Sequence, residues 1–326
     1  MFQIRRVAPD QGIGYESSAL EQIALTDQIT YLVPSKEAQT SFLGCSGLLI
    51  REARVVLIDS NMGPLETPEL LTAVAPDICV ISHYHGDHSR YASEAAEFTK
   101  AKIYVPAEEQ RYLVDFHYFV ERCGIENSEL AQLWLVWLTD QLKLKPVPSA
   151  EPLTAHQIID AGKSKFEVIP TPGHSPGHQT YWEPKQRMLF CTDIGVDTFG
   201  PWYGWRDANL EEYISSIAKL IELDARLLVT SHGGIIKHNV RGALQRCLRV
   251  MRHREELIAR DLDAGLDAAA CASKGHIYGD FSRFSDPLDR LYAVWERNMV
   301  DQHVRLLQKG GIDQLSSFAG SLRTAR

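Results

Sequence analysis

The sequence predicts a layered α/β fold, in which β-sheets are covered by helices. Short aliphatic or β-branched runs at residues 29–34, 45–52 and 54–60 are separated by turn residues, as in β-strands. Segments 69–76 and 90–101 have helical character and lie between such runs. An alternation of this kind is typical of sheets and helices packed in layers.

The same pattern continues through the middle of the chain and then changes. Residues 107–143 interrupt it with a long, mainly helical insertion, and the segment after residue 237 is charged and helical. We therefore predict a domain of residues 1–240 and a C-terminal helical extension of residues 241–326. Further strands are predicted at 77–82, 102–107, 164–173, 179–184, 186–193 and 225–234, and an amphipathic helix at 210–223.

The composition disfavours nucleic-acid-binding, secreted and membrane-spanning proteins. Of the 326 residues, 44% are hydrophobic and 23% are charged, and the net charge of −8 argues against non-specific nucleic-acid binding. The six cysteines are dispersed without a C-x-x-C pair, and the N-terminus lacks the apolar core of a secretory leader. Apolar runs are too short to span a membrane. These features predict a reduced, cytoplasmic protein with no membrane association.

Residues 83–88, HYHGDH, concentrate four metal-ligand side chains directly after a predicted strand. His83 and His85 are two residues apart, so on an extended segment both project to the same side. Gly86 is expected to allow a tight change of direction before Asp87 and His88. Four such groups on one corner cannot all reach a single ion. They suit two ions a few ångströms apart, each with open positions.

Three later residues are candidates for completing a site with two metal ions. His174, Asp193 and His232 each follow a predicted strand and precede a turn. Imidazole and carboxylate ligands favour zinc, iron or manganese. His178, in the same GHSPGH segment as His174, is interpreted as a structural histidine. We predict two bound divalent ions, with zinc expected first and iron or manganese as alternatives.

With these motifs, the sequence resembles the metallo-β-lactamase superfamily over about residues 20–240. The resemblance implies an αββα sandwich with two metals held between its sheets. It also makes Asp59, in VVLIDS, a carboxylate that orients a ligating imidazole. The implied ligands are His83, His85 and His174 for one metal, Asp87, His88 and His232 for the other, and Asp193 as a bridge.

Such a site predicts hydrolysis by a metal-bridging hydroxide, with Asp87 carrying or orienting a proton toward the leaving group. No G-x-S-x-G elbow offers a nucleophilic serine. Trp202, Tyr203 and Trp205, in a glycine-containing loop after Asp193, are candidates for substrate contact. The favoured substrate is a small ester, thioester or lactone. A di-iron oxidoreductase and a β-lactamase are disfavoured, the first because no flavin-binding segment follows residue 240.

The tail contains the segments RHREELIARDLDAG, GHIYG and ERNMVDQHVRLLQKGGI. With them it resembles the winged-helix-like extension of the glyoxalase II-like and endoribonuclease branch of that superfamily. It leaves open an alternative function, cleavage of single-stranded RNA as a phosphodiesterase. Five arginines in the tail could then face phosphate, although a basic solvated helix or a homodimer interface is favoured over nucleic-acid binding. These arginines are Arg246, Arg249, Arg252, Arg254 and Arg260.

Overall fold

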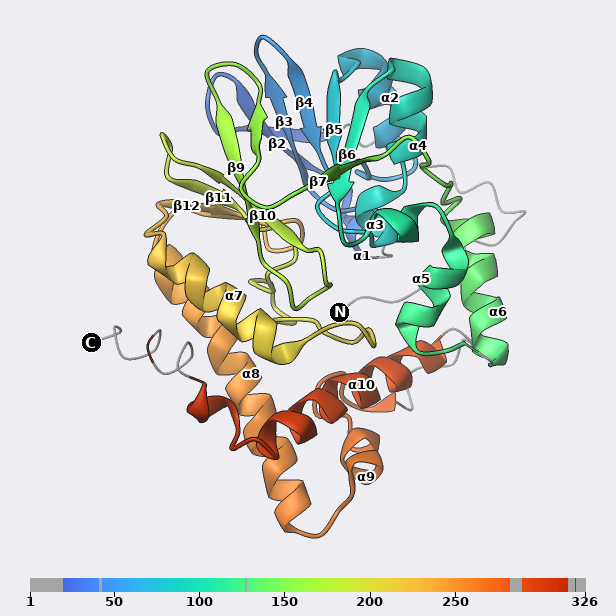
Figure 1. Cartoon of the computed structure of the whole chain (residues 1–326), viewed down its shortest axis with the longest axis vertical. Helices are drawn as coiled ribbons and strands as arrows, with labels where there is room; N and C mark the ends of the chain where they lie inside the picture. Colours follow the sequence, from blue (N-terminus) through green and yellow to red (C-terminus); the bar gives the residue numbers. More distant parts are fainter. Residues whose placement is uncertain (1–19, 41–42, 127, 282–288, 316–319, 321–326) are drawn as a thin grey trace. The chain divides into compact units, whose positions relative to one another are not determined.

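The structure, a computed structural model, describes residues 20–40, 43–126, 128–281, 289–315 and 320 (Figure 1). It is a mixed α/β fold with two sheets and several helices. The N-terminus, for which the sequence predicts no secretory leader, lies outside the described residues. Among the described residues, no helix combines the length and the apolar character needed to cross a bilayer.

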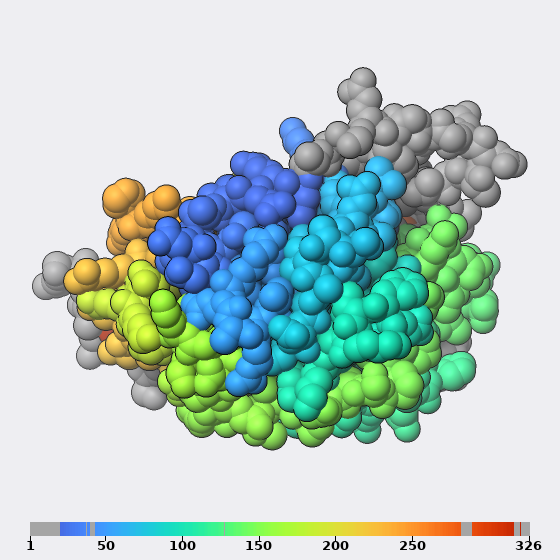
Figure 2. All heavy atoms as spheres, turned by 90° about the horizontal axis from the view of Figure 1, so that it is seen from above, coloured from blue at the N-terminus to red at the C-terminus, as the bar shows by residue number. Residues whose placement is uncertain are grey.

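The first sheet has seven strands that follow one another in chain order. Each neighbouring pair from β1 through β4 is antiparallel, and each neighbouring pair from β4 through β7 is parallel. Figure 2 shows the surface of the stretch that holds β1 to β4 in blue. The strands are β1 Glu21–Ala24, β2 Ile29–Val33, β3 Gly47–Arg51, β4 Val55–Ile58, β5 Ile78–Val80, β6 Lys102–Pro106 and β7 Glu151–Leu153.

The second sheet has six strands in the order β13-β12-β11-β10-β9-β8. Within it, β11 and β12 are parallel, whereas β12 and β13 are antiparallel. The strands are β8 Ile158–Asp160, β9 Lys165–Pro170, β10 Gln179–Glu183, β11 Met188–Phe190, β12 Leu227–Val229 and β13 Ile235–Ile236.

The helices confirm the predicted helical segments, including the region 107–143. α2 begins before the predicted residue 69, and the segment 90–101 divides into α4 and a π-helical turn, η1. The helices are α1 Lys36–Thr40, α2 Glu66–Val74, α3 Gly86–Ser89, α4 Ala92–Glu94, η1 Ala95–Thr99, η2 Gln110–Leu113, α5 Phe116–Cys123, α6 Glu129–Val136, η3 Trp137–Gln141, α7 Leu210–Glu222, α8 Val240–Asp263, α9 Ala268–Ser273, α10 Arg290–Leu307 and η6 Ile312–Gln314.

Backbone contacts divide the chain into two compact units. Unit 1 comprises residues 1–118, 134–169 and 181–185, and unit 2 comprises residues 119–133, 170–180 and 186–326. Helix α8 begins at the predicted domain boundary near residue 240, but whether residues 241–326 form a separate domain stays a prediction.

Helix α7 illustrates how unit 2 acquires its core. Its apolar positions recur at helical spacing, and Tyr213, Ile214 and Ile217 are fully buried. The helix packs against α8 and α10. Its N-cap, Asn209, has an extended backbone, and its side-chain oxygen accepts hydrogen bonds from the amides of Glu211 and Glu212 at 3.1 and 3.2 Å.

All six cysteines are free thiols and are buried. Cys247 donates a hydrogen bond to the carbonyl oxygen of Gly195 over 3.2 Å. Burial raises its pKa to about 12, so the native thiol stays protonated through the alkaline range in which a solvated thiol ionises.

Replacing Asn209 with alanine removes the cap of α7. We expect the free energy of unfolding to fall by about 0.5–2 kcal/mol, because two amides lose their acceptor. Urea denaturation measures the change. Asn209→Asp is the matched control, since aspartate keeps the acceptor oxygen, and equal stability of the alanine and aspartate variants would contradict the prediction.

The thiol of Cys247 should make unfolding more favourable at alkaline pH. Its folded pKa exceeds the unfolded value of about 8.5, so above that pH the unfolded chain binds fewer protons and stability falls. Between pH 8.5 and 10 the wild type should lose about 2 kcal/mol more than Cys247→Ala. Urea denaturation at both pH values tests this, and parallel losses in the two proteins would refute it.

Candidate metal centre

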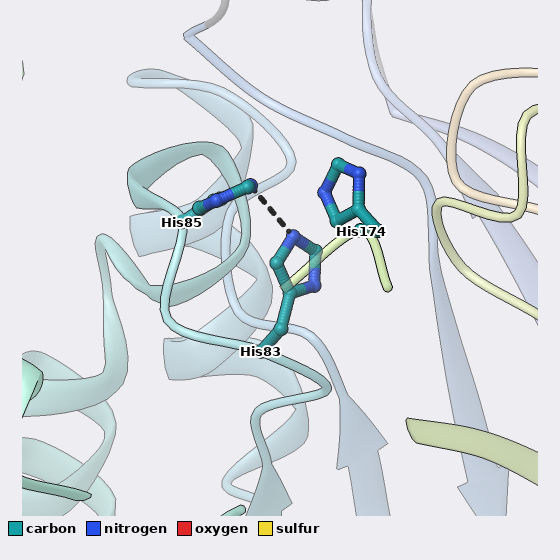
Figure 3. A group of neighbouring side chains, drawn as sticks. All are labelled: His83, His85 and His174. Atoms are coloured by element: carbon teal, nitrogen blue, oxygen red, sulfur yellow. Dashed lines mark hydrogen bonds between the residues drawn. The ribbon is translucent and has the colours of Figure 1, made fainter. Parts of the chain in front are cut away.

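The histidines of the HYHGDH motif meet at the end of β5. His83 Nε2 lies 3.0 Å from His85 Nδ1, and the two rings are edge to face (Figure 3). The backbone bends at residues 82–84, so the extended segment expected here is not formed, but the two rings still come together. Two imidazole nitrogens that approach in this way are suited to one shared ion.

Asp87 and His88 come from α3, a single helical turn that starts at Gly86. His88 Nε2 lies 3.6 Å from Asp87 Oδ2. The φ of Gly86 lies outside the left-handed region that favours glycine. A Cβ at this position would come within 2.4 Å of Leu142 Cδ2, the end of a flexible side chain, so glycine allows close packing here but the backbone does not require it.

Asp59 contacts the other nitrogen of His88. Its Oδ2 accepts a hydrogen bond from His88 Nδ1 at 2.9 Å, and its Oδ1 accepts one from the amide of Ser82 at 2.8 Å. Asp59 is fully buried and has a left-handed backbone, at φ 62°. The carboxylate holds the proton of His88 on Nδ1, which leaves Nε2 available as a ligand atom beside Asp87.

Cys45 is a neighbour of the site that sequence reasoning missed. Its Sγ lies 3.5 Å from His88 Nδ1, and Cys45, Asp59 and His88 form one buried group. Burial raises the pKa of this thiol to about 12, which keeps it neutral. Nothing in the spacing of Cys45, which stands far from the motif in the chain, could have signalled this contact.

Unit 2 gathers His174, Asp193 and His232. Asp193 and His232 follow the parallel neighbours β11 and β12, so they share one edge of the sheet. Asp193 Oδ2 lies 3.5 Å from His174 Nε2, and its Oδ1 lies 3.5 Å from His232 Nε2. The carboxylate of Asp193 therefore has one imidazole nitrogen close to each of its two oxygens.

The tautomer of His174 follows from its other contact. His174 Nδ1 lies 2.8 Å from the carbonyl oxygen of Trp202. A carbonyl oxygen can only accept, so Nδ1 carries the proton and Nε2 presents its lone pair toward Asp193.

His178 anchors the turn that carries Asp193. Its ring is fully buried, and Nε2 accepts hydrogen bonds from the hydroxyl of Thr192 at 2.7 Å and from the amide of Asp193 at 3.3 Å. On the other side, Nδ1 lies 3.1 Å from the carbonyl oxygen of Thr171. These contacts agree with the structural role predicted for His178.

The three aromatic residues proposed for substrate contact differ in exposure. Tyr203 is fully buried and its hydroxyl lies 2.7 Å from His303 Nε2, while Trp205 is 5% exposed and packs edge to face on Phe119. Trp202 is partly exposed and lines a pocket of unit 2 together with His174, Asp193 and His232. Substrate contact by all three stays a prediction.

Comparison with known families identifies the fold and its class of chemistry. Residues 41–232 match the family model described as the metallo-beta-lactamase superfamily, which is more than half of the chain. The chain therefore belongs to the metallo-beta-lactamase superfamily. It is a metallohydrolase, and its histidine and aspartate groups are able to bind metal ions.

Individual relatives are distant. The chain is 26% identical over 184 residues to an atrochrysone carboxyl ACP thioesterase of Aspergillus fumigatus, covering 52% of this chain but only 56% of that protein. It is 22% identical over 191 residues to a probable metallo-hydrolase of Bacillus subtilis, covering 57% of this chain and 78% of that one.

Solved structures extend the likeness over most of the chain. A metallo-beta-lactamase family protein of Thermus thermophilus is 20% identical, with a TM-score of 0.66, over 88% of this chain and 95% of its own. A beta-lactamase domain protein of Burkholderia ambifaria is 17% identical, with a TM-score of 0.65, over 90% of each chain. At these identities the likeness establishes the fold alone.

Asp59→Asn should weaken metal binding. Asparagine fits the left-handed backbone and keeps the shape of the side chain, but it removes the charge that faces His88. We expect the affinity for Zn²⁺ to fall by about 10–100-fold, as for other groups that orient ligating histidines. Competition with a chromophoric chelator measures it.

The matched control is Asp77→Asn in the same unit. Asp77 is an exposed residue, and its carboxylate accepts a hydrogen bond from the amide of Val55 at 2.7 Å. This variant should bind Zn²⁺ as the wild type does. If Asp59→Asn also bound Zn²⁺ with unchanged affinity, the orienting role of Asp59 would be wrong.

Proposed function

We propose that the protein is a dinuclear metallohydrolase that cleaves a small ester, thioester or lactone. One divalent ion is bound by two histidines of the HYHGDH motif and one later histidine, the other by the aspartate and last histidine of the motif and one later histidine. The proposed ligands are His83, His85 and His174 for the first ion, Asp87, His88 and His232 for the second, and Asp193 for both.

The observation that carries the proposal is the position of Asp193 between two imidazoles. Each of its oxygens lies 3.5 Å from one Nε2, the first on His174 and the second on His232. A carboxylate placed in this way can serve two ions. Unit 1 offers ligand atoms of both kinds, because His83 Nε2 lies 3.0 Å from His85 Nδ1 and His88 Nε2 lies 3.6 Å from Asp87 Oδ2.

The donor set fits the ions proposed. Neutral imidazole and carboxylate suit zinc, with iron and manganese as alternatives that the same set accepts. The thiol of Cys45 contacts Nδ1 of His88, whereas the ligand atom proposed for this histidine is Nε2, so Cys45 is not counted among the ligands.

The ions, the groups that orient the histidines and the carboxylate of Asp87 have different tasks in the proposed reaction. When bound, two ions supply a water of lowered pKa and polarise the acyl carbonyl. Asp59 and the carbonyl oxygen of Trp202 fix the proton on Nδ1 of His88 and His174. Asp87 is the residue proposed to move a proton toward the leaving group, because its carboxylate is partly exposed.

An acyl substrate is favoured on two grounds. The partly exposed indole of Trp202 lines the pocket beside Asp193 and offers an apolar surface to an acyl group. One relative, the Aspergillus fumigatus protein, bears the name of a carboxyl ACP thioesterase, although the aligned region is 56% of that protein. The net charge of −8 disfavours a polyanionic substrate.

Turnover by metal-loaded protein tests the proposal. Zinc-, iron- and manganese-loaded samples should hydrolyse at least one member of a panel of acyl thioesters, esters and lactones. Asp193→Asn should lower kcat/KM about 100-fold or more, because it removes the shared carboxylate. Asp224→Asn, an exposed carboxylate paired with Arg187, is the control and should remain fully active.

Two results would contradict the proposal. Absence of turnover across the panel with every metal would exclude a small acyl substrate. Cleavage of a labelled single-stranded RNA, lost in Asp193→Asn, would instead favour the phosphodiesterase alternative.

A further inference from the structure

Arg254 on α8 has surroundings that differ from those expected of a tail arginine. It is 5% exposed, so it cannot face solvent or phosphate as the sequence suggested. Its guanidinium donates to the carbonyl oxygen of Phe199 at 2.7 Å and to that of Pro201 at 2.5 Å. It also lies against the Phe199 ring, with Cζ 5.1 Å from the ring centroid. The fork of a guanidinium suits two acceptors at once.

The segment that Arg254 holds has little regular structure of its own. Residues 201–204 belong to neither a helix nor a strand. Gly200 has φ +83°, and a Cβ there would come within 2.9 Å of Val250 Cγ1, so the segment packs closely on α8. With no ladder of backbone hydrogen bonds here, side-chain contacts set where the carbonyl groups of the segment point. Asp197 accepts hydrogen bonds from the amides of Phe199 and Gly200, and the contacts to the carbonyl oxygens come from Arg254 on α8.

One of those carbonyl groups reaches the candidate metal centre. The carbonyl oxygen of Trp202, next to Pro201, is the acceptor for His174 Nδ1 at 2.8 Å. It fixes both the tautomer and the orientation of the ring. Arg254, the Phe199–Trp202 segment and His174 therefore form a continuous series of contacts within unit 2.

We propose that Arg254 is a positioning residue for His174, acting through the backbone of residues 199–202. Its fork fixes the carbonyl groups of Phe199 and Pro201, and thereby sets the direction of the Trp202 carbonyl. The guanidinium also lies 3.5 Å from the hydroxyl of Tyr203, and the buried carboxylate of Glu296 interacts favourably with its charge. The inference rests on the proposed function only in taking His174 as a metal ligand.

The first test reads the His174 tautomer in metal-free protein. Long-range proton–nitrogen NMR of ¹⁵N-histidine-labelled protein, assigned with His174→Gln, should give the Nδ1-protonated form in the wild type. Arg254→Met should give a mixture of tautomers, because the Trp202 carbonyl is no longer held in place. This readout is independent of activity.

The second test titrates the protein with Co²⁺ and follows its visible absorption. Arg254→Met should weaken one of the two binding steps by about 10–100-fold and leave the other unchanged, since only one ion is proposed to use His174. Arg254→Lys should shift the same step in the same direction, because an ammonium group lacks the fork. Arg252→Met is the control on α8, where the half-exposed arginine pairs with Asp313. It should alter neither step.

The outcomes separate positioning from general structural support. Equal weakening of both Co²⁺ steps, with a large fall in Tm, would overturn the inference in favour of a purely structural arginine. An unchanged tautomer and unchanged binding in folded Arg254→Met would also overturn it. Should Arg254→Met fail to fold, Arg254→Lys decides by the same two readouts. If the wild type hydrolysed no acyl substrate, the tautomer would still report on Arg254.

Discussion

The carboxylate of Asp193, with an imidazole against each oxygen, is the interaction on which the site in unit 2 depends. Its backbone is fixed from both sides. The amide donates to His178 Nε2 at 3.3 Å, and the carbonyl oxygen accepts from the hydroxyl of Tyr213 at 2.5 Å. Because its main chain is held in this way, the carboxylate has less freedom to lose on binding an ion, and the entropic cost of such binding is reduced.

In unit 1, the carboxylate of Asp59 is likewise held in place by its neighbours. Asp59 is fully buried, which would be costly for an isolated carboxylate, but an imidazole, an amide and the hydroxyl of Ser82 surround it. The left-handed backbone at Asp59 aims the side chain back toward His88. A strained position of this kind is characteristic of sites where the surrounding structure determines the geometry.

Much of this arrangement could be predicted from residue types and spacing. Alternating apolar runs indicated the strands at 29–34 and 186–193, and the strand ends located the side chains now found around Asp193. The strands β1, β7, β8 and β13 were missed, because they lack the continuous apolar runs that mark equally short strands such as β5 and β11. Contacts made by the backbone were missed as well. The carbonyl oxygen of Trp202 has no signature in the sequence, since every residue has one.

Arg254 was misassigned for a related reason. Its neighbours on α8 suggested a charged, solvated helix, and periodicity alone cannot tell that one arginine of the series turns inward. Whether an arginine of α8 is buried or solvated depends on which segment of the chain packs against it, and that is a property of the tertiary structure.

That the acceptor for His174 is a main-chain oxygen gives residue 202 two separate tasks. Its peptide fixes the histidine ring through the carbonyl oxygen. Its indole lines the pocket, contacts the His174 ring and donates to the hydroxyl of Tyr278. A substitution at residue 202 therefore keeps the acceptor atom but changes the pocket wall and removes the contact with Tyr278 that holds the segment.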